Sequence, residues 1–518
     1  MEPTDGVRGL SAPGGPIQAA TDREIGRTGA DINADWRERR MQLAVLWLVA
    51  WGTACSFGFH ELVYWDSAGY VQQAITGQIG GLGLGRPVFV LVSHGLAMVH
   101  RALGASPWEL ARFLQMFWLC VSAFSAPLTF LLARECGLAR RAAFFAGLAV
   151  AVSPALAHAN GAVLTDGPAL ATTCFGLLLA LRALNPAHEV GHPLRWGVTG
   201  GVLLGLAFGL REQSVAQIAV YALALLVAPR PRRVPFAVGI VLGLACATIA
   251  PVVWAARTRP DYFAMVWGWV EAMRRERGQH AHGSGNLLAY GGWLFTLGPV
   301  AAPAAVVAWV RHFKDLVSPR RGLAFAVCLP ALAQMALLAG YPDIGYSPRF
   351  LLQSLPGALA IPAGLLLDRI VRTSRRRAMM VLAALVLPTA IAVPIVYARE
   401  RSLVESLVSL PDDLRKLPGR SVVVTGQLCE SIRLAQVIAL REMLAWQGPR
   451  PEWQAVCPGW GWPVDLSERL AGERARGATV VLDLRPSSWR GADQRRDLAE
   501  VSRWERQHEG REGIVVWH

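Results

Sequence analysis

The sequence predicts a polytopic α-helical membrane protein with about eleven transmembrane helices, followed by a small C-terminal α/β domain. Of its 518 residues, 53% are hydrophobic and only 17% are charged, against roughly 25% charged in soluble domains. The mean hydropathy is positive, at +0.34. Apolar stretches such as 236–254, 287–310 and 379–396 each approach the ~20 residues that an α-helix needs to cross a bilayer.

The arginines indicate how the chain crosses the membrane. Residues 1–40 are polar and rich in Gly, Pro, Asp and Arg, which is typical of a disordered tail. Arg37, Arg39 and Arg40 directly precede the first apolar run, and basic residues favour the cytoplasmic side. We therefore expect a cytoplasmic N-terminus. The later basic clusters lie between apolar runs, so topology accounts for the net charge of +14 and nucleic-acid binding is not expected.

Placing every later arginine cluster in the cytoplasm allows a single crossing between residues 60 and 134. Residues 87–99 are short for a span, so they are predicted to form a re-entrant or interfacial helix on the outer side. The expected spans are residues 41–59, 108–133, 142–158, 166–184, 196–210, 213–228, 235–256, 288–310, 322–340, 349–367 and 378–397. The chain then divides into a tail (1–40), a transmembrane domain (41–398) and an extracytoplasmic domain (399–518).

The C-terminal domain alternates strand and helix signals. Apolar or β-branched runs at 421–425, 478–484 and 513–517 predict strands, and residues 430–445 have a helical pattern. This predicts a small α/β layer fold. No glycine-rich dinucleotide motif follows the first strand, so a binding or bracing role is favoured over catalysis. Cys429 and Cys457 also lie here, and their spacing leaves open whether they pair.

Two aspartates are functional candidates because ionisable residues at membrane depth are costly. Asp66 stands among aromatic residues in segment 64–70, just after the first span, and Tyr70 ends that segment. A carboxylate partly shielded from water is suited to act as a general base, and helix N-capping is the alternative role. Asp166 precedes Pro168 at the start of a span, where capping is again the alternative.

Two arginines are expected on the same outer face. Arg211 and Glu212 interrupt an apolar stretch between two spans, where the alternative is a simple turn, and Arg349 opens a later span. Guanidinium groups are well suited to hold phosphate. The loop 257–287 carries arginines, histidines and tryptophans, which predict either a helix lying on lipid headgroups or a gate over a lipid-linked phosphate. Its two histidines lack a third ligand, so no metal site is predicted.

A base beside cationic groups suits transfer from a lipid-phosphate donor, because arginines stabilise the negative charge that grows on the leaving phosphate. At this point the chain resembles the polyprenyl-phosphate-sugar-dependent membrane glycosyltransferases of the GT-C superfamily, especially the protein O-mannosyltransferase and aminoarabinose–lipid A transferase branch. The resemblance covers residues 40–400. It rests on the Asp66 segment, Gly85-Arg86-Pro87, Thr165-Asp166-Gly167-Pro168, Leu210-Arg211-Glu212, and Pro348-Arg349-Phe350 followed by Leu355-Pro356.

The resemblance implies an inverting transfer at the outer face of the cell membrane, from an undecaprenyl- or dolichyl-phosphate sugar to an envelope glycan, lipid or protein. It implies Asp66 as the catalytic base and Arg211 and Arg349 as phosphate ligands. Asp166, Tyr70 and Glu212 complete the predicted substrate-binding set. Ser67 stands where this branch often has a second acidic residue, which argues against a divalent metal and against protein mannosylation.

Two other classes of protein remain open. One is a multi-pass transporter or flippase of a lipid-linked or anionic substrate, and the other is a non-catalytic assembly protein. Secondary transporters usually show internal repeats and mid-membrane charges. Here the halves show no repeat and the unusual polar residues gather at one face, which favours the enzyme.

Overall fold

The computed structural model describes most of the helical part of the chain and part of the C-terminal region. The described residues are 29–58, 65–105, 109–185, 188, 191–279, 285–317, 323–339, 348–372, 374–417, 419–424, 452–456, 466–483, 510–511 and 514–517. The chain divides into two compact units, Met1–Val45 and Leu46–His518. The site and its supporting helices lie in the second unit.

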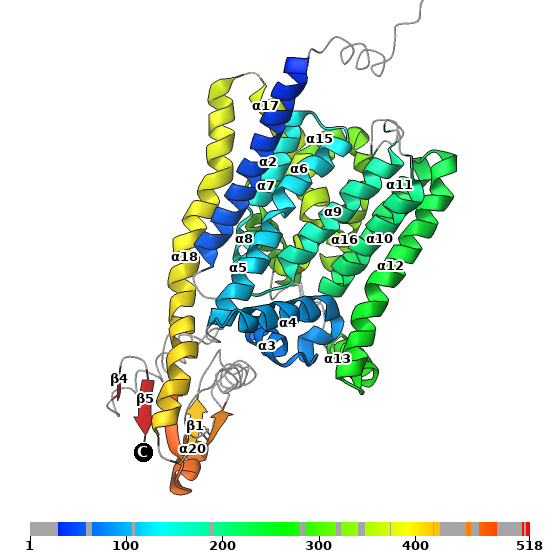
Figure 1. Ribbon diagram of the computed structural model, residues 1–518. Helices are drawn as coiled ribbons and strands as arrows, with labels where there is room; N and C mark the ends of the chain where they lie inside the picture. The colour runs from blue at the N-terminus through cyan, green and yellow to red at the C-terminus, as the bar shows by residue number, and fades with distance from the viewer. Residues whose placement is uncertain are drawn as a thin grey trace, which may run out of the picture. The chain divides into compact units, whose positions relative to one another are not determined.

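Helices dominate the second unit (Figure 1). In chain order the helical elements are α2 (Gly29–Phe57), α3 (Trp65–Thr76), η1 (Gly81–Gly85), α4 (Pro87–Ala102), α5 (Leu110–Ala123), α6 (Ser125–Glu135), α7 (Arg140–Ala151), α8 (Pro154–Asn160), α9 (Asp166–Leu184), α10 (Pro193–Leu210), η3 (Glu212–Gln217), α11 (Ile218–Val227), α12 (Arg230–Thr258), α13 (Tyr262–Gln279), α14 (Gly285–Leu297), α15 (Ala301–Val317), α16 (Ala324–Ala339), η6 (Pro348–Ser354), η7 (Leu355–Ala360), α17 (Ile361–Val371) and α18 (Arg375–Lys416).

The fold class is confirmed: the chain is a polytopic helical membrane protein. By length and composition, six helices of the described part are suited to cross a membrane. They are Leu110–Glu135, Asp166–Leu184, Pro193–Leu210, Arg230–Thr258, Pro348–Val371 and Arg375–Ala398. Two bent helix pairs raise this number to eight, and Glu212–Val227 and Ala324–Leu338 are shorter apolar helices. The total of eleven spans and their orientation stay predictions.

Two expected spans are wrong in their detail. Residues 142–158 were expected to form a single helix, but the chain bends by 54° between Arg140–Ala151 and Pro154–Asn160. Residues 288–310 were expected to form a single helix, but the chain bends by 103° between Tyr290–Leu297 and Ala301–Val317. This second break falls at Gly298 and Pro299. Proline lacks an amide hydrogen and disfavours helical geometry in the residue before it. The segment is therefore a broken span or a re-entrant loop.

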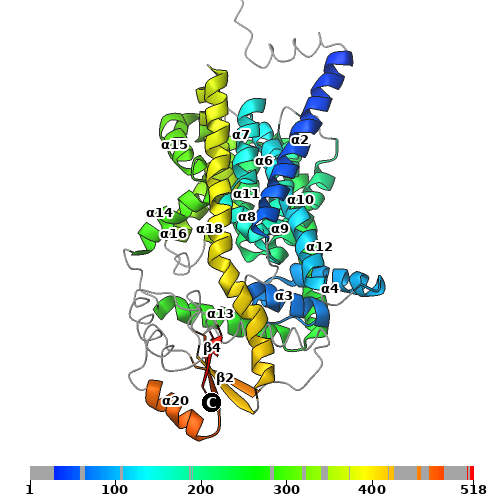
Figure 2. The same cartoon turned by 90° about the vertical axis from the view of Figure 1, so that its left-hand side faces the viewer.

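The predicted short helix at 87–99 is present as α4. Figures 1 and 2 show α3, α4 and α13 at one end of the bundle, and α3 and α4 run across the direction of α9, α10 and α12. Tyr262 of α13 fixes this layer, because its hydroxyl donates a hydrogen bond to the carbonyl oxygen of Leu84 at 2.9 Å. Placement of this layer in the outer interface stays a prediction.

Helices α10 and α12 approach each other closely through small residues. A Cβ atom on Gly201 would lie 2.2 Å from the carbonyl oxygen of Ile240, and one on Gly243 would lie 2.1 Å from that of Val198. Small residues four apart allow such backbone contact between membrane helices. The contact holds α10 in place, and Arg211 follows directly at the end of that helix.

The described C-terminal residues form a five-stranded sheet of order β2-β1-β3-β5-β4. Strand β1 pairs in parallel with β2 and β3, whereas β5 pairs antiparallel to β3 and β4. The strands are β1 (Arg420–Val424), β2 (Glu452–Val456), β3 (Thr479–Asp483), β4 (Gly510–Arg511) and β5 (Ile514–Trp517), and α20 (Leu466–Ala475) precedes β3. The three expected strands are confirmed as β1, β3 and β5. Residues 430–445 and both cysteines lie outside the described residues.

Candidate active site

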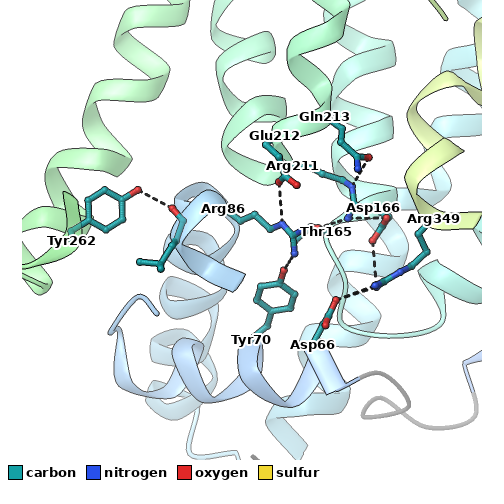
Figure 3. Close-up of polar contacts among 11 residues, drawn as sticks. Asp66, Tyr70, Arg86, Thr165, Asp166, Arg211, Glu212, Gln213, Tyr262 and Arg349 are labelled. Carbon is teal, nitrogen blue, oxygen red and sulfur yellow. Dashed lines mark hydrogen bonds and ion pairs between the residues drawn. The ribbon is translucent and has the colours of Figure 1, made fainter. Parts of the chain in front are cut away.

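The structure brings together the four charged residues that the topology placed on one face (Figure 3). Both Nη1 and Nη2 of Arg349 lie 3.2 Å from Oδ2 of Asp66, across 283 positions of sequence. Nη1 of Arg349 also lies 3.9 Å from Oδ2 of Asp166. The other oxygen of Asp166, Oδ1, lies 2.9 Å from Nη1 of Arg211. The two aspartates and two arginines thus form one continuous chain of ion pairs.

These charges are buried. Asp66 is 5% exposed, Asp166 is 1% exposed and Arg211 is 2% exposed. A buried charge is tolerated when an opposite charge lies beside it, so the pairing explains how these residues remain inside an apolar bundle. It also means that each member depends on the others for its position.

Helix capping, the alternative role for the aspartates, is not what their side chains do. Oδ1 of Asp66 accepts no hydrogen bond from the described residues, and neither carboxylate oxygen of Asp166 does so. The contacts of Asp166 are ion pairs with Arg211 and Arg349. Oδ1 of Asp66 is therefore a buried acceptor that Arg349, bound to Oδ2, leaves unoccupied.

A second group of three residues lies beside this chain. Nε of Arg86 lies 3.4 Å from Oε2 of Glu212, and Nη1 of Arg86 donates a hydrogen bond to the hydroxyl of Tyr70. Arg86 immediately precedes α4, whose first residue is Pro87. The sequence pointed to Arg86 only as part of the Gly85-Arg86-Pro87 motif. The glycine-rich turn before it and the proline after it are weak signals and did not single it out as a site residue.

Burial raises the pKa of the Tyr70 phenol, although the nearby Arg86 acts in the opposite direction. The phenol therefore stays neutral at physiological pH. Its oxygen accepts a hydrogen bond from Arg86, which leaves its own O–H to donate to a ligand. Burial alone would lower the pKa of the Arg86 guanidinium, but Tyr70, Glu212 and Asp66 raise it above its usual range. Arg86 is thus a permanent cation in the site.

Uncharged groups hold the arginines in place. Arg211 lies over the ring of Phe350, with its Cζ 5.8 Å from the ring centroid. Its Nε donates to Oε1 of Gln213 at 3.2 Å and its Nη1 to Oγ1 of Thr165 at 3.4 Å. The side chain of Gln353 donates to the carbonyl oxygen of Asp166 at 3.2 Å. Thr165 and Phe350 stand in the motifs named above, whereas sequence reasoning missed Gln213 and Gln353, because an uncharged polar side chain in an apolar run carries no signal of its own.

The loop expected at 257–287 contains α13. Two of its aromatic side chains are largely exposed, Phe263 at 65% and Trp267 at 66%, as expected for a helix on lipid headgroups. The basic residues proposed for a gate, from Arg274 onward, have side chains outside the described part. Among the described residues, no group of three or more His, Cys, Asp or Glu is arranged to hold a metal ion.

No family model matches the chain, and no curated protein sequence matches it. Its fold, however, is shared with solved structures of membrane enzymes that belong to the GT-C superfamily. ArnT from Cupriavidus metallidurans bound to undecaprenyl phosphate is similar with a TM-score of 0.53 and 15% identity, over 92% of this chain and 96% of that chain.

Two archaeal structures share the fold. The oligosaccharyltransferase of Archaeoglobus fulgidus, tethered to an acceptor peptide, has a TM-score of 0.51 and 13% identity, over 86% of this chain and 69% of that chain. AglB from the same organism, in complex with an inhibitory peptide and a dolichol-phosphate, has a TM-score of 0.50 and 12% identity, over 90% and 72% of the two chains. At such identities the likeness establishes the fold, and the GT-C resemblance is confirmed at that level.

Proposed function

We propose that this protein is a membrane glycosyltransferase that moves a sugar from a polyprenyl-phosphate-linked donor to an envelope acceptor at the outer face of the membrane. The observation that carries the proposal is the carboxylate of Asp66. It is buried, Arg349 holds one of its oxygens at 3.2 Å, and its other oxygen accepts no hydrogen bond from the described residues. This arrangement suits a base whose reactive oxygen faces a substrate.

In this reaction the acceptor hydroxyl or amine lies against Oδ1 of Asp66. The acceptor atom forms a bond to the anomeric carbon of the sugar while its proton passes to Oδ1. The bond between that carbon and the phosphate oxygen breaks, and the polyprenyl phosphate leaves with the electron pair. Attack opposite to the leaving group inverts the anomeric configuration. Arg349 keeps the carboxylate oriented throughout by its contact with Oδ2.

The arginines account for the departure of the polyprenyl phosphate. Negative charge grows on the phosphate as it leaves, and fixed cations in a buried site stabilise such charge without reorganising. Arg86, Arg211 and Arg349 provide three guanidinium groups in two neighbouring groups of ion pairs. The fold shared with ArnT, whose structure contains undecaprenyl phosphate, and with AglB, whose structure contains a dolichol-phosphate, supports a lipid-phosphate donor.

Replacing Asp66 by Asn tests the proposal, because the amide keeps the shape of the side chain and cannot accept the proton. We expect glycan transfer to fall by about 10²–10⁴-fold while the protein still inserts in the membrane. Transfer is measured in membranes supplied with a labelled polyprenyl-phosphate sugar, and mass spectrometry of envelope glycans from a deletion strain identifies the product.

Asp368→Asn is the matched control. Asp368 is also a buried aspartate, 2% exposed, and pairs with Arg141 and Arg372 near the opposite end of the span that Arg349 opens. Replacing Asp368 should disturb folding about as much as replacing Asp66. We expect the Asp368→Asn variant to retain transfer in proportion to the amount of protein inserted in the membrane. Unchanged transfer in Asp66→Asn would remove Asp66 as the base, whereas a wild type that transfers no sugar would favour the transporter class.

A further inference from the structure

The charges of the site are balanced before any substrate binds. In the described network each guanidinium group already has its own carboxylate: Arg349 with Asp66 at 3.2 Å, Arg211 with Asp166 at 2.9 Å, and Arg86 with Glu212 at 3.4 Å. The phosphodiester of the donor brings a charge of about −1, and the phosphate monoester that leaves brings about −1.5 to −2 at pH 7. A balanced site offers such a group no net attraction, so one of these pairs must open when it binds.

Burial indicates which pair opens. The side chains of Asp66 and Asp166 are 5% and 1% exposed, and Asp166 is shared by two arginines. Withdrawing Arg349 would leave the buried Asp66 without compensation, and withdrawing Arg211 would leave Asp166 with only the more distant Arg349, at 3.9 Å, so either step is unfavourable. The side chain of Glu212 is 36% exposed and its contact with Arg86 is the longest of the three. Of the three carboxylates, Glu212 can therefore leave its arginine and become hydrated with the smallest loss of free energy.

Arg86 stays in place when Glu212 leaves. Its Nη1 donates to the hydroxyl of the buried Tyr70, and its Cζ lies 5.9 Å from the centre of the same ring. Glu212 and Trp269 border the backbone beside it: a Cβ on Gly85 would be in ordinary contact with Oε2 of Glu212 at 3.9 Å and with Cη2 of Trp269 at 3.8 Å. Figure 3 shows Arg86 between Tyr70 and Glu212.

We propose that Glu212 occupies on Arg86 the place of the donor phosphate, so that binding of the lipid-linked donor requires the Arg86–Glu212 ion pair to open. This inference rests on the proposed function and adds to it a residue that sets donor affinity. Glu212 acts as an internal competitor for the phosphate. Apparent affinity for the donor phosphate is reduced by the fraction of molecules in which the pair is closed.

Undecaprenyl phosphate titrated into the full-length protein in nanodiscs, with binding followed by native mass spectrometry, tests the inference. We expect Glu212→Gln to bind this lipid about three- to tenfold more tightly than the wild type, since opening a partly exposed pair costs little. Glu135→Gln is the matched control: Glu135 pairs with Arg182 at 2.7 Å, outside this network, and we expect its binding to be unchanged.

Glu212→Asp separates direct competition from the general effect of a negative charge. The shorter side chain keeps the charge but falls short of Arg86 by one methylene, so we expect it to tighten binding as well. Tighter binding in Glu212→Gln with none in Glu212→Asp would overturn the inference, as would unchanged or weaker binding in both. If Glu212→Gln fails to fold, Glu212→Asp decides alone.

The proposed function and this inference fail in different ways. If the wild type does not bind undecaprenyl phosphate and neither Glu212 variant does, the lipid-phosphate donor is wrong and both proposals fall. If the wild type binds the lipid and the Glu212 variants bind it no better, only the role of Glu212 falls. The Asp66→Asn result is then unaffected, because that experiment measures transfer.

Discussion

The ion pair between Arg211 and Asp166 makes a quantitative prediction about stability. Both side chains are nearly inaccessible, and their 2.9 Å contact is the shortest ion pair of the site. Replacing Arg211 by Met removes the charge and keeps much of the apolar stem. Removing one partner of a buried pair costs about 3–5 kcal/mol. Because Arg349 remains 3.9 Å from Asp166, we expect a loss near the lower end, about 3 kcal/mol.

A double-mutant cycle isolates the pair itself. Asp166→Asn in the Arg211→Met background removes the uncompensated charge, so the double variant should lose less than the sum of the single losses. We expect a coupling free energy of about 1.5–3 kcal/mol, as found for residues in direct contact. The free energy of unfolding is measured by titration with a denaturing detergent in mixed micelles. The four proteins of the cycle are compared under identical conditions.

Arg141→Met provides the matched control for this cycle. Arg141 also pairs with a buried aspartate, Asp368, at 2.5 Å, but its own side chain is half exposed and Asp368 keeps Arg372 at 2.8 Å. We expect a loss below about 1 kcal/mol. A loss below about 1 kcal/mol for Arg211→Met as well, or strictly additive losses in the cycle, would refute the view that this pair holds the site together.

Two further predictions concern the scaffold around the site. Gly201→Ala should markedly reduce the amount of folded protein, because its Cβ would lie 2.2 Å from the carbonyl oxygen of Ile240, whereas Gly95→Ala, which meets nothing within 4 Å, should be tolerated. Detergent-resistant fluorescence-detected chromatography measures both, and equal yields would contradict the packing argument. Gln115→Leu should cost about 1–3 kcal/mol, because it leaves the buried carbonyl oxygen of Gly161 without its hydrogen bond donor. If the Gln115→Leu variant unfolds at the same detergent concentration as the wild type, water or another group has replaced the lost hydrogen-bond donor.

Long apolar helices were predictable, but breaks within them were not. Residues 166–184 were expected as a span and form α9 with the same ends. Residues 288–310 looked equally apolar and bend by 103°. Hydropathy averages over a window and does not register one Gly-Pro step. The proline in α16, at position 330, lies inside a helix that continues past it, so proline alone does not predict a break either.

The sequence predicted which residues belong to the candidate site better than it predicted which of them contact one another. Asp66, Asp166, Arg211 and Arg349 were selected because charge near an apolar span is costly, and the structure brings all four into one network. Arg86 was passed over as a candidate, because a single arginine before a proline has no distinctive pattern. Its role becomes evident only beside its partners.

The sequence by itself determined the class of protein and the position of most spans. It also pointed to the charged residues that are candidates for the site. Each of these can be read from local composition, since a charge or a backbone break is costly wherever it meets hydrocarbon. Only the tertiary structure decided which arginine pairs with which carboxylate. It also decided that Oδ1 of Asp66 accepts no hydrogen bond from the described residues and that the side chain of Glu212 is 36% exposed. Ion pairing falls off within a few ångströms, so it depends on how helices far apart in sequence pack against one another.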